Sequence, residues 1–283
     1  TKSIICVRMD YLVAVPEPRL VPFAPNSAII ARYARGRDYH KVMRGRLKTL
    51  SQKIKAKVGD FESRPFADSA PIFEKSLAEN AGMGWVGKHT LLIHKTSGSF
   101  FVLGELFTSL ELPFDQATTK HCGSCSACID ICPTQAIVEP YLLDARKCIA
   151  YLTIEFQGII PEELRRGIGN HVFGCDDCQL ICPWNSFAKT TPIDDFNPRH
   201  GLDDIQLIDL WQWDENTFMA NTEGSPLRRT GYQSFMRNVA IGLGNAPFSD
   251  EILQQLQASR PELNDIVQVH IDWAIQEQLM KRH

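Results

Sequence analysis

Residues 122–133 read CGSCSACIDICP, so four cysteines follow one another at the spacing Cys-x2-Cys-x2-Cys-x3-Cys, and a proline ends the run. A second group starts at Cys148 and continues in residues 175–183, CDDCQLICP, which repeat the end of the first run. Eight of the nine cysteines belong to these two groups, which we call the cysteine ladder, and Cys6 lies outside it. This clustering indicates metal ligation.

The spacing of the first run is typical of bacterial ferredoxins, in which it binds [4Fe-4S] clusters. Three thiolates bind one cubane, while the fourth cysteine, one helical turn later, serves a second cluster. This cross-ligation predicts two ligand sets. The first is Cys122, Cys125, Cys128 and Cys182, and the second is Cys132, Cys148, Cys175 and Cys178. Two zinc sites are the alternative, since Cys-x2-Cys pairs also bind zinc, but zinc does not account for the repeated spacing.

The composition favours a cytoplasmic protein. Of the 283 residues, 44% are hydrophobic and 22% are charged, so a substantial core can form. No uncharged apolar run approaches the ~20 residues that span a bilayer, and the first residues do not resemble a signal peptide. Disulfide frameworks need an oxidising compartment. We therefore expect reduced, metal-binding cysteines, no membrane association, and Cys6 as a small buried core residue.

Hydrophobic patterning predicts an α+β protein with three domains, at residues 1–120, 121–195 and 196–283. In the first domain we expect strands at residues 3–15, 89–94 and 99–106 and a mostly helical segment at 26–58. In the last domain, residues 225–243 and 264–280 have apolar side chains at helical spacing. Two such segments are compatible with HEAT-like repeats, and a simple helical subdomain is the alternative.

Positive charge is concentrated in residues 32–57, which hold ten Lys or Arg residues and one acid, Asp38, in a chain whose net charge is -3. A phosphate backbone is the partner that such a segment fits best, and a solvated helix face is the alternative.

Two local motifs do not predict the ligands that they first suggest. Residues 82–88, GMGWVGK, match G-x-G-x-x-G and resemble a P-loop. They follow a helix-like stretch, and His89 stands where a P-loop needs Ser or Thr, so we expect a tight turn or a close backbone approach rather than NAD or ATP. Asp38-Tyr39-His40 begins the Asp-x-His-x-x-Gly pattern that supplies an axial histidine to cobalamin, but Met43 breaks it, so we expect no such ligand.

Several stretches resemble the epoxyqueuosine reductases, a family of tRNA queuosine biosynthesis. They are the cysteine ladder and residues 3–12 (SIICVRMDYL), 31–44 (ARYARGRDYHKVMR), 64–72 (RPFADSAPI), 82–90 (GMGWVGKHT), 98–106 (GSFFVLGEL) and 174–185 (GCDDCQLICPWN). The resemblance covers essentially the whole chain. Family members carry further sequence before the position of Thr1, so we expect residues 1–120 to form a cobalamin-binding domain without its N-terminal part.

The resemblance implies base-off cobalamin in an α/β domain, a ferredoxin-like domain with two [4Fe-4S] clusters, and a HEAT-like domain that helps to hold tRNA. The implied reaction removes the epoxide oxygen of epoxyqueuosine at the tRNA wobble position, in a two-electron, two-proton reduction that releases water. The clusters would pass electrons to cobalt, with the set of Cys132, Cys148, Cys175 and Cys178 nearer the corrin. We further expect a monomer and an electron donor of the flavodoxin or ferredoxin type.

The resemblance also implies site residues. The family's proton donor aligns with Asp68, and we expect its apolar neighbours to raise its pKa above the usual ~3.9. A helix N-cap is the alternative role for Asp68, and Tyr39 or an ordered water is the alternative acid. The residues expected to contact cobalamin are Arg32, Tyr33, Lys88, His89, Gly104, Glu105, Asp176 and Asp177. The residues expected to contact tRNA are Arg35, Lys41, Arg44, Arg228, Arg229 and Arg237.

Two other functions share these features. One is plain electron transfer, which a bound corrinoid would exclude. The other is reductive dehalogenation of a small organohalide, against which the basic segment and the lack of an export signal argue.

Overall fold

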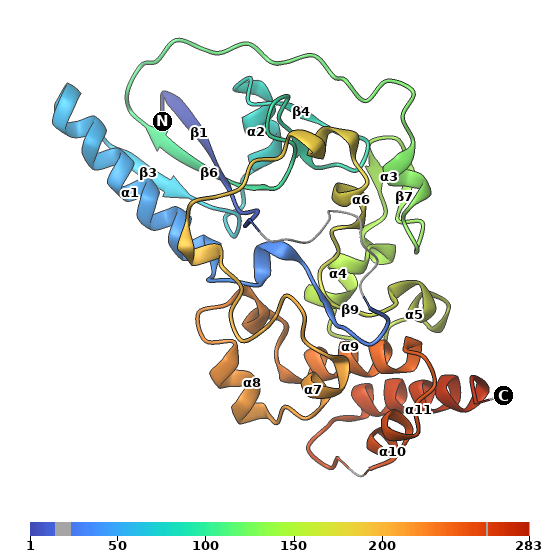
Figure 1. Cartoon of the computed structure of the whole chain (residues 1–283). Coiled ribbons are helices and arrows are strands. Elements are labelled where there is room, and N and C mark those ends of the chain that lie inside the picture. Colours follow the sequence, from blue (N-terminus) through green and yellow to red (C-terminus); the bar gives the residue numbers. More distant parts are fainter. Residues whose placement is uncertain (15–23, 259, 283) are drawn as a thin grey trace.

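The protein is described by a computed structural model that covers residues 1–14, 24–258 and 260–282 (Figure 1). A small sheet and the long helix α1 (Tyr39–Val58) lie at one end of the molecule, and the C-terminal helices lie at the other. The cysteine-rich segment runs along one side between them. The fold is therefore mixed α and β, as the sequence predicts. No helix in these ranges has the length and apolarity needed to cross a membrane.

The N-terminal sheet has three antiparallel strands in the order β1-β6-β3. Their bounds are β1 (Ser3–Asp10), β6 (Phe101–Thr108) and β3 (Ser63–Phe66). The expected strand at residues 3–15 therefore ends at Asp10, and Val15 lies outside the described residues. Cys6, on β1, is partly buried and packs against the small apolar cluster of Ala78, Leu92 and Phe101.

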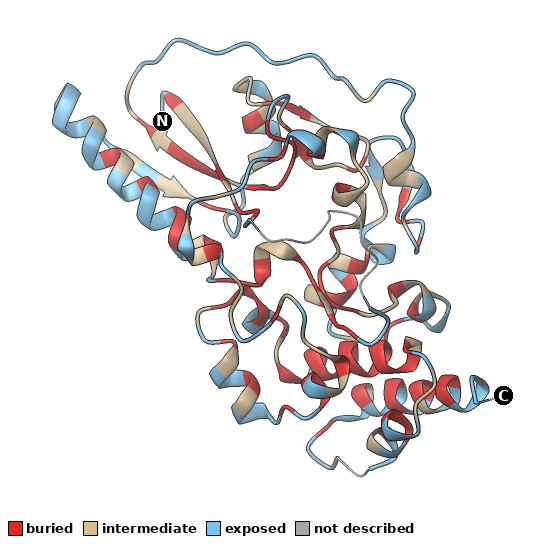
Figure 2. Ribbon diagram, viewed as in Figure 1, coloured by how far each residue is buried: buried red, intermediate tan, exposed pale blue. Residues whose placement is uncertain are grey.

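Gly104 lets helix α1 approach this sheet closely. A Cβ atom at Gly104 would lie 2.8 Å from the side chain of Met43 and 3.2 Å from that of Leu47, both of which are buried on α1. We expected Gly104 to contact cobalamin, but the structure gives it a packing role instead. The opposite side of α1 faces solvent (Figure 2).

The predicted helix at residues 26–58 is only partly correct, because α1 begins at Tyr39. The preceding residues form strand β2 (Ile29–Ile30) and a 3-10 helix at Arg32–Ala34. Strand β2 pairs with β9 (His171–Phe173), far along the chain, and local helical spacing does not reveal such a pairing. Asp38 caps α1, since its side chain accepts a hydrogen bond from the His40 backbone N–H at 3.0 Å.

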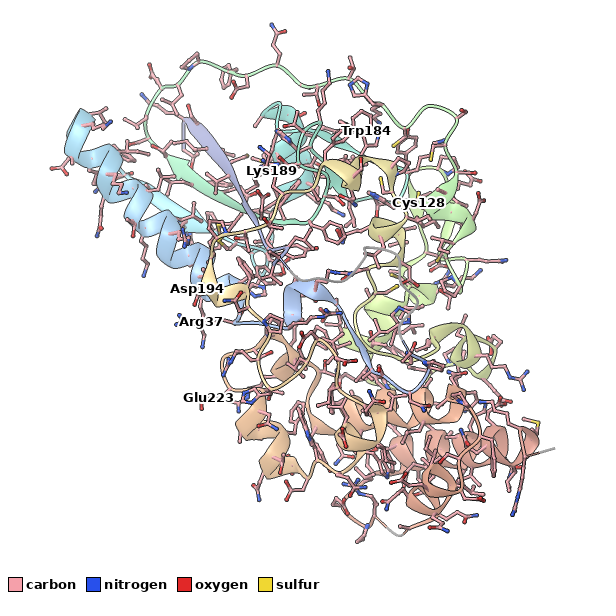
Figure 3. The ribbon with its side chains drawn as sticks, viewed as in Figure 1. Arg37, Cys128, Trp184, Lys189, Asp194 and Glu223 are labelled. Carbon is pink, nitrogen blue, oxygen red and sulfur yellow. The ribbon has the colours of Figure 1, made fainter. Side chains whose placement is uncertain are left out.

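The start of α1 is attached to the C-terminal part of the chain. The backbone N–H of Arg37 donates to the Asp195 carbonyl at 2.7 Å, and that of Asp38 donates to the Gly224 carbonyl at 2.7 Å. The Arg37 guanidinium also pairs with the Asp195 carboxylate at 3.0 Å. Figure 3 labels Arg37 beside the segment that carries Asp194, with Glu223 below it. These bonds fix the first turn of α1, which carries Tyr39 and His40, two residues of the site described below.

The glycine motif at residues 82–88 connects a helix to a pair of short strands. Helix α2 (Glu74–Asn80) precedes it, and β4 (Trp85–Val86) pairs with β5 (Leu92–Ile93). A Cβ atom at Gly84 would collide with the Ile93 carbonyl oxygen. The glycine therefore permits a close approach of two backbones, and the arrangement differs from the strand-to-helix order of a dinucleotide site.

Short elements carry the cysteine ladder. They are α3 (Ala127–Asp130), β7 (Ile137–Glu139), β8 (Leu142–Leu143), α4 (Ile149–Ile154), α5 (Glu162–Ile168), β9 and α6 (Asp177–Leu180), with 3-10 turns at Ala145–Lys147, Pro183–Phe187 and Asp194–Phe196. Helices α3 and α6 lie against each other. Each carries a cysteine and is followed within two residues by another and then by proline.

The C-terminal region is helical. Its helices are α7 (Leu207–Trp211), α8 (Glu215–Asn221), α9 (Tyr232–Asn245), α10 (Asp250–Gln257) and α11 (Asp265–Met280). The predicted helix at residues 225–243 is instead a 3-10 turn, Pro226–Thr230, followed by α9 after Gly231. Helix α9 is almost wholly buried, and α11 packs along it (Figure 2). One apolar core joins these helices to β2, α4 and β9.

Candidate active site and cluster-binding region

The eight ladder cysteines surround two cavities, four to each. A cavity of about 440 Å³, the first cysteine cavity, is lined by Cys122, Cys125, Cys128 and Cys182. A cavity of about 360 Å³, the second cysteine cavity, is lined by Cys132, Cys148, Cys175 and Cys178. These are the two sets that the spacing predicts. All nine cysteines are free thiols, and Figure 3 labels Cys128 and Trp184, which both line the first cysteine cavity.

Hydrogen bonds hold the loops around these cavities. The Lys88 ammonium donates to the Gly123 and Cys125 carbonyls, both at 2.8 Å, and so fixes the loop of the first cysteine cavity. The expected contact of Lys88 with cobalamin stays a prediction. The Ala136 backbone N–H donates to the Cys132 sulfur at 3.3 Å, a contact that stabilises a thiolate.

The donor set fits iron-sulfur clusters. Burial and, to a smaller extent, the neighbouring Cys182 and Cys122 raise the pKa of the Cys128 thiol to about 11. Burial likewise raises the pKa of Cys175 to about 11. Iron binding must therefore displace protons, and four soft sulfur donors around each cavity suit this chemistry.

The second cysteine cavity adjoins two others. The tyrosine cavity, of about 290 Å³, is lined by Tyr11, Tyr33 and Tyr39 and shares Tyr33, Lys75, Leu91 and Gln179 with the second cysteine cavity. The basic cavity, of about 500 Å³, shares Tyr33, Tyr39 and Asp68 with the tyrosine cavity. The three cavities are therefore neighbours, and Tyr33 lines all of them.

Asp68 is the centre of a hydrogen-bonded group. Its Oδ2 atom accepts hydrogen bonds from the Tyr39 hydroxyl and from His40 Nε2, the latter at 3.0 Å. The other ring nitrogen of His40, Nδ1, lies 2.7 Å from the Asp38 carboxylate. The backbone N–H of Asp68 donates to the Glu74 carboxylate. The helix-cap alternative for Asp68 is wrong, because α2 begins at Glu74 and Phe73 occupies the capping position.

The electrostatics of this group differ from the expectation. The hydrogen bond from His40 outweighs burial and lowers the pKa of Asp68, so the predicted rise was wrong. Burial alone would lower the pKa of His40, but hydrogen bonds to Asp38 and Asp68 raise it to about 9. At neutral pH the proton therefore resides on His40, between two carboxylates. The Asp-Tyr-His sequence was considered only as a cobalt-binding motif, which is why His40 was missed.

Four of the six expected tRNA-binding residues line the basic cavity, namely Lys41, Arg44, Arg228 and Arg229. Lys41 and Arg44 are exposed on the first turns of α1. Arg229 is half-exposed and pairs with Glu155 at 3.0 Å. Positive side chains from two distant segments therefore line the cavity to which Asp68 contributes, together with the acidic residues Asp38, Glu155 and Glu223.

The other two assignments to tRNA are wrong. Arg237 is fully buried and donates to the carbonyls of Leu152, Phe156 and Gly158 at 2.7–2.8 Å. Arg35 is 4% exposed, and its Nε donates to the Ile30 carbonyl at 2.9 Å. Both side chains hold loops together inside the protein, so neither can reach a phosphate.

The other residues that we expected to contact cobalamin fall into two groups: acidic residues that interact within the protein, and residues that line cavities. Asp176 is buried and accepts from the Arg32 backbone N–H at 2.8 Å, and Asp177 lies 3.3 Å from His171 beside Cys175. Glu105 is fully buried under the Asp68 loop, where burial and then the adjacent Glu74 raise its pKa to about 8. Tyr33 and His89 line cavities.

Comparisons with known proteins agree with this geometry. Residues 1–69 match the family model described as "Epoxyqueuosine reductase QueG, DUF1730", and residues 121–185 match that of the "4Fe-4S double cluster binding domain". The epoxyqueuosine reductase of Pseudomonas aeruginosa is 54% identical over 276 residues, which are 97% of this chain and 76% of that protein.

Solved structures of epoxyqueuosine reductases are also similar to this chain. A crystal structure of epoxyqueuosine reductase with an epoxyqueuosine-modified tRNA-Tyr stem loop has a TM-score of 0.87 at 27% identity, over 97% of this chain and 73% of the other. The Bacillus subtilis epoxyqueuosine reductase, solved with its catalytic aspartate loop swung out of the active site, has a TM-score of 0.85 at 26% identity, over 97% and 73% of the two chains. This chain therefore belongs to the epoxyqueuosine reductase family of oxidoreductases and contains its 4Fe-4S cluster-binding domain.

Proposed function

We propose that this chain removes the epoxide oxygen of epoxyqueuosine in tRNA to give queuosine, using cobalamin and two [4Fe-4S] clusters. Two electrons and two protons enter, both C–O bonds of the epoxide break, a C=C bond forms, and the oxygen leaves as water. The observation that carries the proposal is that the second cysteine cavity, the tyrosine cavity and the basic cavity are neighbours, with Asp68 lining the last two.

The basic cavity is the proposed site of the modified nucleotide. Lys41, Arg44 and Arg228 supply charge for the flanking phosphates, which position the RNA without reading its sequence. The helical C-terminal region, HEAT-like in this proposal, contributes Arg228 and Arg229 and extends the surface for the stem. We place the reaction in the cytoplasm, with a monomeric enzyme.

The cysteine cavities are the proposed cluster sites, one [4Fe-4S] cluster in each. Cys125 is exposed, so electrons from a flavodoxin or ferredoxin type of donor enter most directly at the first cysteine cavity. The second cysteine cavity shares four lining residues with the tyrosine cavity and is the one that continues toward Asp68.

Tyr33, Leu91 and Gln179, which line both the tyrosine cavity and the second cysteine cavity, are the proposed residues that hold cobalamin. When bound, cobalamin supplies a low-potential cobalt centre that delivers electrons to the strained epoxide. Both ring nitrogens of His40 face carboxylates, so this ring has no nitrogen free for cobalt. His40 is therefore not among the residues that would hold cobalamin.

Asp68 and His40 deliver the proton in this proposal. Asp68 lines the basic cavity, where the alkoxide of a cleaved epoxide would form. The carboxylate receives a proton from His40, one of its two hydrogen-bond donors, and passes it on. Burial and Asp68 raise the pKa of Tyr39, so Tyr39 keeps its own proton and orients the carboxylate. A general acid therefore operates here although the pKa of Asp68 itself is low.

The test is direct conversion. The protein, reconstituted anaerobically with iron, sulfide and cobalamin and supplied with a strong reductant, should convert epoxyqueuosine in tRNA into a nucleoside that lacks one oxygen, as measured by mass spectrometry of digested tRNA. The Pseudomonas aeruginosa relative is the positive control. Unchanged epoxyqueuosine in the presence of reduced clusters and bound cobalamin would refute the proposal.

A further inference from the structure

His89 has a buried N–H group without an acceptor. The side chain is 3% exposed and lies in the loop between β4 and β5. Its Nδ1 accepts the Leu91 backbone N–H at 3.1 Å, and burial, helped by Lys75, lowers the pKa of the ring to about 4. The ring is therefore neutral with its proton on Nε2, and Nε2 has no hydrogen-bond partner in the described part of the chain.

The position of this ring indicates where its acceptor lies. His89 lines both the first and the second cysteine cavity. A buried donor without a partner is unfavourable, and buried polar groups in proteins are nearly always bonded. The proposed occupants of these cavities carry sulfide and thiolate sulfurs, which accept hydrogen bonds.

We propose that the Nε2–H group of His89 donates a hydrogen bond to a sulfur of one of the two [4Fe-4S] clusters and raises the reduction potential of that cluster. The inference rests on the proposed function for the presence of the clusters. Reduction adds a negative charge to a cluster, so a donor stabilises the reduced form more than the oxidised form. Removing the donor should therefore make that cluster harder to reduce.

His94 offers a matched control in the same loop region. Its Nδ1 accepts the Thr96 backbone N–H at 3.2 Å, which is the same contact to a residue two positions later that His89 makes. His94 lines neither cysteine cavity. Replacing either histidine by Phe removes a ring acceptor from a turn, but only His89→Phe removes a donor from the cavities.

The experiment is a redox titration of the reconstituted holoenzyme followed by EPR, with iron content measured on the same samples. In His89→Phe, one cluster should show about tenfold less reduced form at a fixed potential, a shift of about 59 mV for one electron, while the other stays unchanged. The cluster that shifts identifies the acceptor. His94→Phe should titrate like the wild type, and His89→Gln, whose amide N–H can replace Nε2–H, should restore most of the potential.

A second measurement does not depend on the Phe variant assembling its clusters. With ¹⁵N-labelled histidine, His121 and His171, which lie at the cysteine cavities, contribute nitrogen couplings to the pulsed EPR spectrum in both proteins. The reduced wild type should contain one further weak coupling that His89→Gln lacks, because the glutamine amide is unlabelled. Unchanged potentials in His89→Phe with full iron content would overturn the inference, as would identical ¹⁵N couplings in wild type and His89→Gln. Failure of turnover alone concerns the proposed function, since cluster potentials are measured without substrate.

Discussion

The residues around Asp68 show how a carboxylate with a low pKa can serve as a proton donor. His40 lies between Asp38 and Asp68, at 2.7 and 3.0 Å, and both contacts favour its charged form. Tyr39 offers a second donor to the same oxygen of Asp68. In our proposal Asp68 is the contact point with the substrate, and His40 holds the proton that is transferred.

The pKa of His40 predicts the pH dependence of turnover. The protonated ring is present below a pKa of about 9 and is lost as pH rises through that value, so kcat should fall there. Any stability from the charged ring has the same sign: it is complete below the unfolded pKa of 6.5 and lost as pH rises through about 9.

The variant Asp38→Asn checks this assignment. Asn caps a helix about as well as Asp, so α1 should keep its start, but one of the two carboxylates that raise the pKa of His40 is removed. The alkaline limb of kcat, measured on epoxyqueuosine-tRNA, should move to lower pH. An identical limb in both proteins would remove His40 from the proton path.

At the scale of elements, α1 carries positive charge along its length, but only its first turns adjoin the site. Lys41 and Arg44 line the basic cavity, whereas Lys53 and Lys57 are exposed on the distal half. Lys41→Ala/Arg44→Ala should weaken tRNA binding and reduce the slope of log affinity against log salt by about 2. Lys53→Ala/Lys57→Ala removes equal charge and should have a smaller effect; equal effects would indicate a non-specific charged face.

Arg237 connects two elements, since it lies on α9 and its side chain bonds to the end of α4. Its guanidinium is fully buried and donates to three backbone carbonyls. Arg237→Met should lower the free energy of unfolding by roughly 3 kcal/mol, since buried acceptors lose charged donors. Lys2→Ala, which breaks the ion pair with Glu111 in which both side chains are exposed, should cost far less in the same denaturation measurement.

Equal losses in these two variants would contradict the structural role of Arg237. In folded Arg237→Met protein, tRNA affinity should match that of wild type, because this side chain cannot reach RNA. A selective loss of affinity would restore the original assignment to tRNA.

The sequence predicted some elements better than others for physical reasons. The two cysteine sets follow from spacing within short segments, and the structure groups the cysteines in the same way. The start of α1 was misplaced because β2 pairs with β9, a contact between distant segments. Arg35 and Arg237 were misassigned because counting charges does not reveal burial. His40 meets Asp68 across 28 positions, a separation that no local pattern connects.

For the whole molecule, the account requires two clusters. Anaerobic reconstitution should give about eight iron and eight acid-labile sulfides per chain, because eight ladder thiols surround two cavities. Cys148→Ser should damage one cluster, whereas Cys6→Ser should leave iron content unchanged, since Cys6 packs on β1 outside both cavities. Zinc in place of iron would contradict the cluster assignment.

The most direct test of the central claim, that this chain reduces epoxyqueuosine with Asp68 at the point of proton transfer, compares Asp68→Asn with wild type. Asn preserves the shape of the side chain but cannot pass a proton between His40 and the substrate oxygen. Single-turnover conversion of epoxyqueuosine in tRNA should fall by ~10²–10⁴, with iron content, cobalamin binding and tRNA affinity unchanged. An Asp68→Asn enzyme that converts epoxyqueuosine at the wild-type rate would contradict the account.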